Sequence, residues 1–170
     1  ETKGADKYFG SPTRIAHLDD NGTPDIIIVQ GGANDASDHV TLGTFNQDDP
    51  TDLTDAQIAA LPVNTFCDAY RTMLIRLIKS YPNAQIVCVI PPYCAQNSVF
   101  FGMDVLNAEA EAIYEITSYF GIPVIDWRKA NMSFVRRQTI MGADGIHPNS
   151  MGHYLIYKKV IDFLFSNQTV

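Results

Sequence analysis

A carboxylate and an imidazole stand three residues apart in the run Asp144-Gly145-Ile146-His147-Pro148-Asn149. A histidine that moves protons during hydrolysis needs a partner that fixes the tautomer of its ring and stabilises the imidazolium. Asp144 can be that partner if the backbone turns back between the two residues. Gly145 permits such a turn, and Pro148 keeps His147 extended and suits the start of a helix. The spacing therefore predicts an Asp144–His147 pair, with an ordinary surface turn as the alternative.

A second group of residues with chemical potential follows an apolar run far upstream, in Gly31-Gly32-Ala33-Asn34-Asp35. Glycines at the end of a strand let the backbone turn sharply and approach a ligand closely, which makes Gly32 a candidate substrate-binding position. The Asn34 amide can donate a hydrogen bond to a developing oxyanion without needing protonation. The alternative is a glycine-rich turn in which Asn34 and Asp35 cap the next segment.

Three apolar runs are typical of buried parallel strands, and helical patterns separate them. The predicted strands are residues 25–30, 85–90 and 123–126, and the predicted helices are residues 65–80, residues 104–120 and a segment that starts after Ser150. This alternation predicts an α/β fold with a parallel sheet. Ligands bind beyond the carboxyl ends of such strands, where Asn34, Tyr93 and Asp126 follow the three runs.

The predicted sheet is narrow, because three strands leave edges that need covering. The first 24 residues contain a helical stretch, Pro12 to Leu18, and no strand pattern. We therefore expect the sheet to be incomplete within this chain. The segment from Val40 to Leu61 is polar and is predicted to be a surface excursion, and residues 94–102 form another loop.

Composition limits the classes of function. The 170 residues suit one domain, 1–170, and 46% of them are hydrophobic. A net charge of −7 argues against a nucleic-acid or anionic-membrane partner, and no apolar run approaches the ~20 residues of a membrane span. Cys67, Cys88 and Cys94 show no metal-ligand spacing and are expected to be thiols. We expect no metal or cofactor, and composition leaves compartment and oligomeric state open.

The two motifs together resemble one family. Gly32-Ala33-Asn34-Asp35 is similar to the GxND block of the SGNH (GDSL-type) hydrolases, and Asp144-Gly145-Ile146-His147 is similar to their DxxH block. The resemblance extends from about Arg14 to the C-terminus, apart from the variable loops. It implies a three-layer α/β/α sandwich with a flavodoxin-like sheet and an esterase or acyl hydrolase activity. It also implies a catalytic triad and an oxyanion hole, with His147 as general base, Asp144 as its orienting partner and Asn34 as an oxyanion donor.

The sequence also departs from this family. The family's nucleophilic Ser lies in a Gly-Asp-Ser block at the end of the first strand, and a second block supplies a Gly to the oxyanion hole. Neither block is present among these residues, and none of the eight serines follows an apolar strand. The missing strand and the missing nucleophile are thus explained by one hypothesis, that the chain is an N-terminally shortened piece whose Ser lies outside it.

Three functions remain open at this point. The first is a Ser-dependent esterase that acts on small-molecule, glycan or lipid esters. The second is a non-catalytic binding module that has kept the fold and lost the nucleophile. The third is a metallophosphoesterase, for which the candidate ligands are Asp35, Asp38, His39, Asp144 and His147. We rank this third function last, because its ligands fit no familiar spacing and Asn34 would lack a role.

Overall fold

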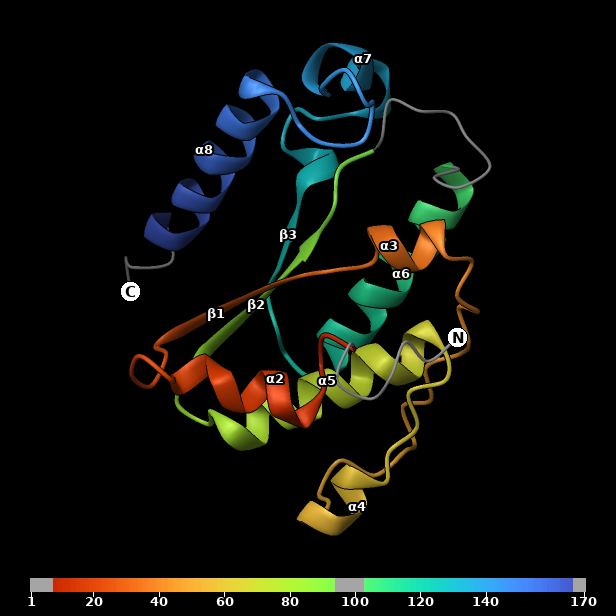
Figure 1. Ribbon diagram of the computed structural model, residues 1–170, viewed down its shortest axis with the longest axis vertical. Helices are drawn as coiled ribbons and strands as arrows, with labels where there is room; N and C mark the ends of the chain where they lie inside the picture. Colours follow the sequence, from red (N-terminus) through yellow and green to blue (C-terminus); the bar gives the residue numbers. More distant parts are fainter. Residues whose placement is uncertain (1–7, 94–102, 167–170) are drawn as a thin grey trace.

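The structure is a computed structural model that describes residues 8–93 and 103–166. Its strands, β1 (Ile26–Gln30), β2 (Gln85–Ile90) and β3 (Val124–Asp126), form one parallel sheet in the order β1-β2-β3. The helices are α2 (Pro12–Ala16), α3 (Ala33–Ser37), α4 (Asp55–Ala59), α5 (Phe66–Ser80), α6 (Met103–Tyr119), α7 (Arg137–Ile140) and α8 (Ser150–Ser166), with short 3-10 turns at His17–Asp19, Trp127–Lys129 and Phe134–Arg136. The predicted α/β class is confirmed, and Figure 1 shows the path of the chain.

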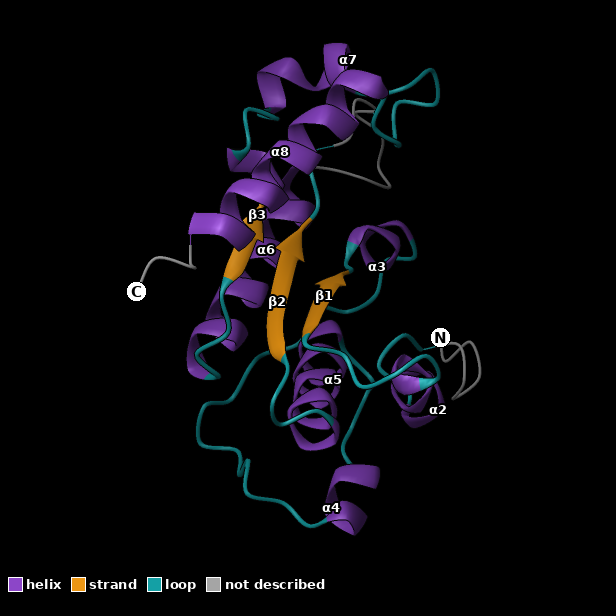
Figure 2. Ribbon diagram, turned by 90° about the vertical axis from the view of Figure 1, so that its left-hand side faces the viewer, coloured by secondary structure: helices purple, strands orange, loops and turns teal. Residues whose placement is uncertain are grey.

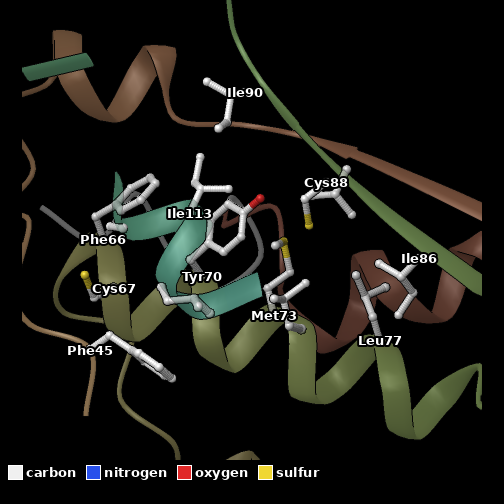
Figure 3. Close-up of a cluster of buried hydrophobic side chains, with 14 of the residues drawn as sticks. Phe45, Phe66, Cys67, Tyr70, Met73, Leu77, Ile86, Cys88, Ile90 and Ile113 are labelled. Atoms are coloured by element: carbon white, nitrogen blue, oxygen red, sulfur yellow. The ribbon is translucent and has the colours of Figure 1, made fainter. Parts of the chain in front are cut away.

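Helices α2, α5 and α6 cover one face of the sheet, where the main hydrophobic core lies. Helix α5 starts at Thr65, whose side chain accepts a hydrogen bond from the Asp68 N–H and so caps the first turn. Its apolar residues recur at three- and four-residue steps and pack beneath the strands. Figure 3 shows Tyr70 and Met73 of this helix beside Cys88 of β2 and Ile113 of α6. Cys67 and Cys88 are buried free thiols, as expected.

Helix α8 covers part of the opposite face and completes a three-layer arrangement. It packs on Val87 and Val89 of β2 and on Ile125 of β3. The side chains that it contributes are Leu155, Ile156, Val160 and Phe163. In Figure 2, α8 lies in front of β3, whereas β1, on the far side of β2, has no helix over this face.

Strand β1 is therefore covered on only one face. In the sheet register Ile28 is the partner of Val87, so the two side chains point to the same face. Val87 is fully buried by α8, whereas Ile26 and Ile28 are 44% and 46% exposed. Within residues 8–93 and 103–166, no strand pairs with the other edge of β1. The narrow sheet that the sequence predicts is thus present.

The surface excursion between Val40 and Leu61 contributes more to the core than its polarity indicates, which corrects the prediction. Phe45, Leu53 and Ile58 are all buried, and residues 55–59 form the short helix α4. Phe45 packs edge-on against Tyr119 of α6, and Ile58 joins a small cluster with Ile75 of α5. These buried side chains help to anchor the polar segment to α5 and α6. The predicted loop at 94–102, with Cys94, lies outside the described residues.

Helices long and apolar enough to cross a bilayer do not occur within the described part of the chain.

Candidate active site

Asp144 and His147 form the predicted pair at the end of the chain's last loop. The His147 Nδ1 atom lies 2.6 Å from Asp144 Oδ2. The other carboxylate oxygen, Oδ1, accepts hydrogen bonds from the backbone N–H groups of Ile146 and His147. Gly145 takes a positive φ of 69°, which allows the chain to fold back over the carboxylate. Both side chains are exposed to solvent.

These hydrogen bonds keep Asp144 ionised. The bond from His147, followed by the two backbone bonds, lowers the pKa of Asp144 to about 2. With Nδ1 engaged by this carboxylate, Nε2 is the ring nitrogen that remains to exchange a proton with a reactant. The pair therefore has the arrangement of a general base with an orienting carboxylate.

Asn149 fastens the loop that carries this pair to the body of the molecule. Its amide nitrogen donates to the carbonyls of Thr139 and Met141, and its side-chain oxygen accepts from the N–H groups of Met151 and Gly152 at the start of α8. Asn149 therefore caps this helix. The Gly142 N–H donates to the His147 carbonyl, so the histidine backbone is held as well.

The turn that carries Asn34 is built differently. Gly32 has a φ of 113°, a conformation that side chains rarely adopt, and its carbonyl accepts the first hydrogen bond of α3 from Ala36. A Cβ atom at Gly32 would lie 3.2 Å from Glu109 Oε2 and 3.7 Å from the Phe66 ring. Only glycine fits here without strain, and the resulting turn leaves Asn34 exposed at the carboxyl end of β1.

Gly32, Asn34 and His147 line the same cavity, of about 570 Å³, beyond the carboxyl ends of the strands. Asp144 supports His147 from behind and is not among the lining residues. Trp127, which follows β3, lines the cavity too. Tyr93 does not, although Pro91 and Pro92 before it do, and its hydroxyl donates to Asn107 of α6. The expected convergence of strand ends is therefore partial. Of Asn34, Tyr93 and Asp126, only Asn34 lines the cavity, and the buried carboxylate of Asp126 pairs instead with Arg128.

The described lining holds acidic and aromatic side chains and contains no Ser, Thr or Cys. Asp35 and Asp38 contribute the carboxylates. Among the described residues, no group of three or more His, Cys, Asp and Glu side chains is placed to hold a metal ion. The ligand set of the metallophosphoesterase alternative, which combined Asp35, Asp38 and His39 with the Asp144–His147 pair, is thus not assembled.

Comparison with known proteins identifies the family of this chain. The sequence profile of the GDSL-like lipase/acylhydrolase family matches residues 4–155. The chain belongs to this family. A search of curated proteins gave no match.

Solved structures give the same fold for this GDSL-family chain. A protein from Lactobacillus plantarum is 25% identical with a TM-score of 0.67, and the match covers 84% of this chain and 67% of that one. A lipase/acylhydrolase from Enterococcus faecalis is 19% identical with a TM-score of 0.63, over 95% of this chain and 68% of that one. A candidate GDSL-like lipase from Bacteroides uniformis is 26% identical with a TM-score of 0.61, over 91% of this chain and 57% of that one.

Sequence reasoning missed several residues of the GDSL-family cavity. Phe66, Tyr70 and Met73 line it, whereas their spacing predicted only that they share one face of the helix at 65–80. Tyr8 and Phe9 also line it, from a segment that carried no pattern. For the first three residues a signal was present but ambiguous, since one face of a helix can serve both a core and a pocket floor.

Glu109 is the other residue that sequence reasoning missed. It lies on the apolar side of α6, three positions after Leu106 and four before Ile113, and is only 4% exposed. Its Oε2 atom has no hydrogen-bond partner among the described residues. Burial, together with the nearby charge of Asp35, raises the pKa of Glu109 to about 8. A carboxylic acid inside an apolar stripe was visible in the sequence, but its position behind Gly32 was not.

Proposed function

We propose that this chain is the larger part of a serine-dependent ester hydrolase, with a nucleophilic Ser supplied from outside the 170 residues. The observation that carries the proposal is the shared cavity. Its lining includes the His147 imidazole, which lies 2.6 Å from the Asp144 carboxylate, and the Asn34 amide. His147 is the general base, Asp144 its orienting partner and Asn34 an oxyanion donor. Gly32 lets the backbone come close to the substrate.

The mechanism is two-step acyl transfer. The Ser Oγ attacks the ester carbonyl carbon while His147 Nε2 takes the hydroxyl proton, and Asp144 stabilises the imidazolium. The Asn34 amide donates to the oxyanion of the tetrahedral intermediate, which collapses when His147 protonates the departing alkoxide. Water then attacks the acyl-enzyme by the same route, releasing the acid and restoring the Ser.

The free side of β1 supports this source of the nucleophile. One more parallel strand on the open edge of β1 would end beside Gly31, at the cavity that Asn34 and His147 share. A helix that follows such a strand would cover Ile26 and Ile28, which are now exposed. One strand–helix segment would thus pair with the free edge of β1, bury two isoleucines and deliver a side chain to the site.

Hydrolysis of p-nitrophenyl acetate tests this proposal directly. We expect the 170-residue chain to be nearly inert and a longer form, with the upstream segment of its gene, to turn the ester over. Replacing the Ser at the end of the added strand by Ala should abolish that turnover. Enzymatic rates from the 170-residue chain alone would contradict the assignment of roles.

The substrate class within this proposal is an acetyl or acyl ester of a carbohydrate or lipid. Aromatic and apolar side chains, including Phe66, Tyr70 and Trp127, form much of the cavity lining and suit a neutral acyl group. A series of p-nitrophenyl esters from acetyl to long acyl chains, assayed on the longer form, separates acetyl esterase from lipase-like preference.

A non-catalytic binding module is the second candidate, and the lack of Ser, Thr and Cys in the described cavity lining favours it. The two functions separate on the longer form. A catalyst turns over the ester, whereas a binding module binds an uncleavable ester analogue with unchanged affinity when His147 is replaced by Gln.

A further inference from the structure

Glu109 is a buried acid that the proposed mechanism does not use, and it lies directly behind the turn that carries Asn34. Its Oε2 atom would be 3.2 Å from a Cβ on Gly32, and Phe66 closes the same space. Helix α6, which carries Glu109, packs on α3, which carries Asn34. Glu109 therefore packs against the turn at Gly32, two residues before Asn34.

We infer that Glu109 is a positioning residue: its neutral carboxyl group supports the Gly31–Asn34 turn, and loss of its proton displaces that turn together with Asn34. The consequence for catalysis rests on the proposed function, whereas the movement of the turn does not.

The surroundings of Glu109 fit only its neutral form. A carboxylate that is buried needs hydrogen-bond donors, and none among the described residues reaches Oε2. The flexible point beside the carboxyl group is Gly32, which sits at a positive φ and can change conformation more readily than a residue with a side chain. When Glu109 ionises, we therefore expect the backbone to move at this turn rather than within the packed helix.

The ionisation of other titratable groups packed around α6 can be distinguished from that of Glu109. From α3, Asp35 acts as a nearby negative charge that disfavours ionisation of Glu109. From α5 and β2, the Tyr70 hydroxyl points toward Cys88 in Figure 3. Burial raises the pKa of Tyr70 well above its usual value and that of Cys88 to about 11, so both stay neutral near pH 8.

Nuclear magnetic resonance of the 170-residue chain tests the inference without any assay of activity. Between pH 6 and pH 10 we expect the backbone signals of Gly32 and Ala33 and the side-chain amide of Asn34 to shift with one midpoint near pH 8. Glu109→Gln, which keeps the shape and cannot ionise, should abolish this shift. Glu111→Gln, an exposed acid on the same helix, should leave it intact. Asp35→Asn should retain the shift and lower its midpoint, because a like charge is removed.

Two results would overturn the inference: signals of the turn that do not move between pH 7 and pH 9, or a shift that persists in Glu109→Gln. The carboxyl carbon signal of Glu109 in the unsubstituted chain gives its midpoint even if a variant fails to fold. In the longer form, kcat/KM should fall above pH 8 and stay level in Glu109→Gln. A longer form without esterase activity would refute the proposed function and leave the titration of the turn as measured.

Discussion

Asp144 holds both the ring and the backbone of His147, and these two tasks use different carboxylate oxygens. Oδ2 meets the imidazole, and Oδ1 accepts the N–H groups of Ile146 and His147. Since the pKa of Asp144 is lowered to about 2, the carboxylate is charged throughout the neutral range. Its electrostatic and its structural contribution can therefore be separated by substitution.

Asp144→Asn separates them, because an amide keeps the Oδ1 acceptor and loses the charge. In a longer form that carries the proposed Ser, we expect kcat to fall by about 10²–10⁴ while the melting temperature changes little. Asp144→Ala should lower kcat similarly and also lower the melting temperature, since the loop loses its internal acceptor. Steady-state kinetics and thermal unfolding measure the two effects. Unchanged kcat in Asp144→Asn would remove this residue from the mechanism.

Asn34→Ala probes the opposite side of the cavity. Loss of one oxyanion donor is expected to lower kcat by about 10²–10³, with little change in stability because Asn34 is exposed. Steady-state kinetics of the longer form and urea unfolding of the 170-residue chain measure these two quantities. A variant that loses activity only because it unfolds would instead assign Asn34 a structural task.

Glu109 makes folding pH-dependent in a direction that can be worked out. Below its ordinary pKa of 4.5 the carboxyl is neutral in both the folded and the unfolded chain. As pH rises toward about 8, the unfolded chain loses this proton first, so the free energy of unfolding falls. Glu109→Gln should remove this fall in stability. The free energy of unfolding of the variant should therefore exceed that of the parent by an amount that grows between pH 4.5 and pH 8.

We expect that advantage to reach on the order of 1–3 kcal/mol near pH 8. Urea unfolding at several pH values measures it, with Glu111→Gln as the exposed control on the same helix. An advantage that is equal at all pH values would mean that Glu109 does not titrate with a raised pKa in the folded protein.

At the scale of elements, the contact between α8 and the loop before it positions His147. Gly152 lies where the helix meets this loop, and a Cβ there would overlap with the Ile140 carbonyl oxygen. Since that atom belongs to the backbone, Gly152→Ala has to move the helix or the loop. We expect a loss of about 1–3 kcal/mol in the free energy of unfolding, measured with urea.

His153→Ala is the matched control, because His153 is the next residue of the same helix and is exposed. Its effect should stay within about 0.5 kcal/mol. If Gly152→Ala were as harmless as this control, the close approach of α8 to the loop would not be required for the fold.

The accuracy with which each helix or strand could be predicted depended on the length of its apolar repeat in the sequence. Strand β2 was predicted to the residue and α5 to within one, because their apolar residues recur without interruption. Helix α3 has only five residues and follows a positive-φ glycine. It is too short to show a helical repeat of apolar residues in the sequence. The contact between Asp144 and His147 is local in sequence and could be predicted from their spacing. The burial of Glu109 depends on how α6 packs against the rest of the fold, so it could not be predicted from the sequence.

At the scale of the whole molecule, the two faces of the sheet are unequally covered. Helices α2, α5 and α6 bury Ile27 and Val29 of β1, whereas Ile26 and Ile28 on the other face remain in contact with solvent. An open strand edge next to exposed isoleucines is a template for pairing with another chain. The 170-residue chain should therefore associate with itself at high concentration.

Ile28→Lys tests the coverage of this face. In the 170-residue chain Ile28 is 46% exposed, so we expect the substitution to reduce self-association in sedimentation velocity and to change stability by no more than about 0.5 kcal/mol. Val135→Lys is the control, because Val135 is 86% exposed, is outside the sheet and should leave association unchanged.

The same Ile28→Lys substitution should behave in the opposite way in the longer form. If an added strand and helix cover β1 there, the lysine is forced beneath them and the free energy of unfolding falls by a few kcal/mol, because a charge loses its water. Val135→Lys again should have no effect. Equal tolerance of Ile28→Lys in both forms would show that the upstream segment does not cover this face, and the nucleophile would then need another route to His147 and Asn34.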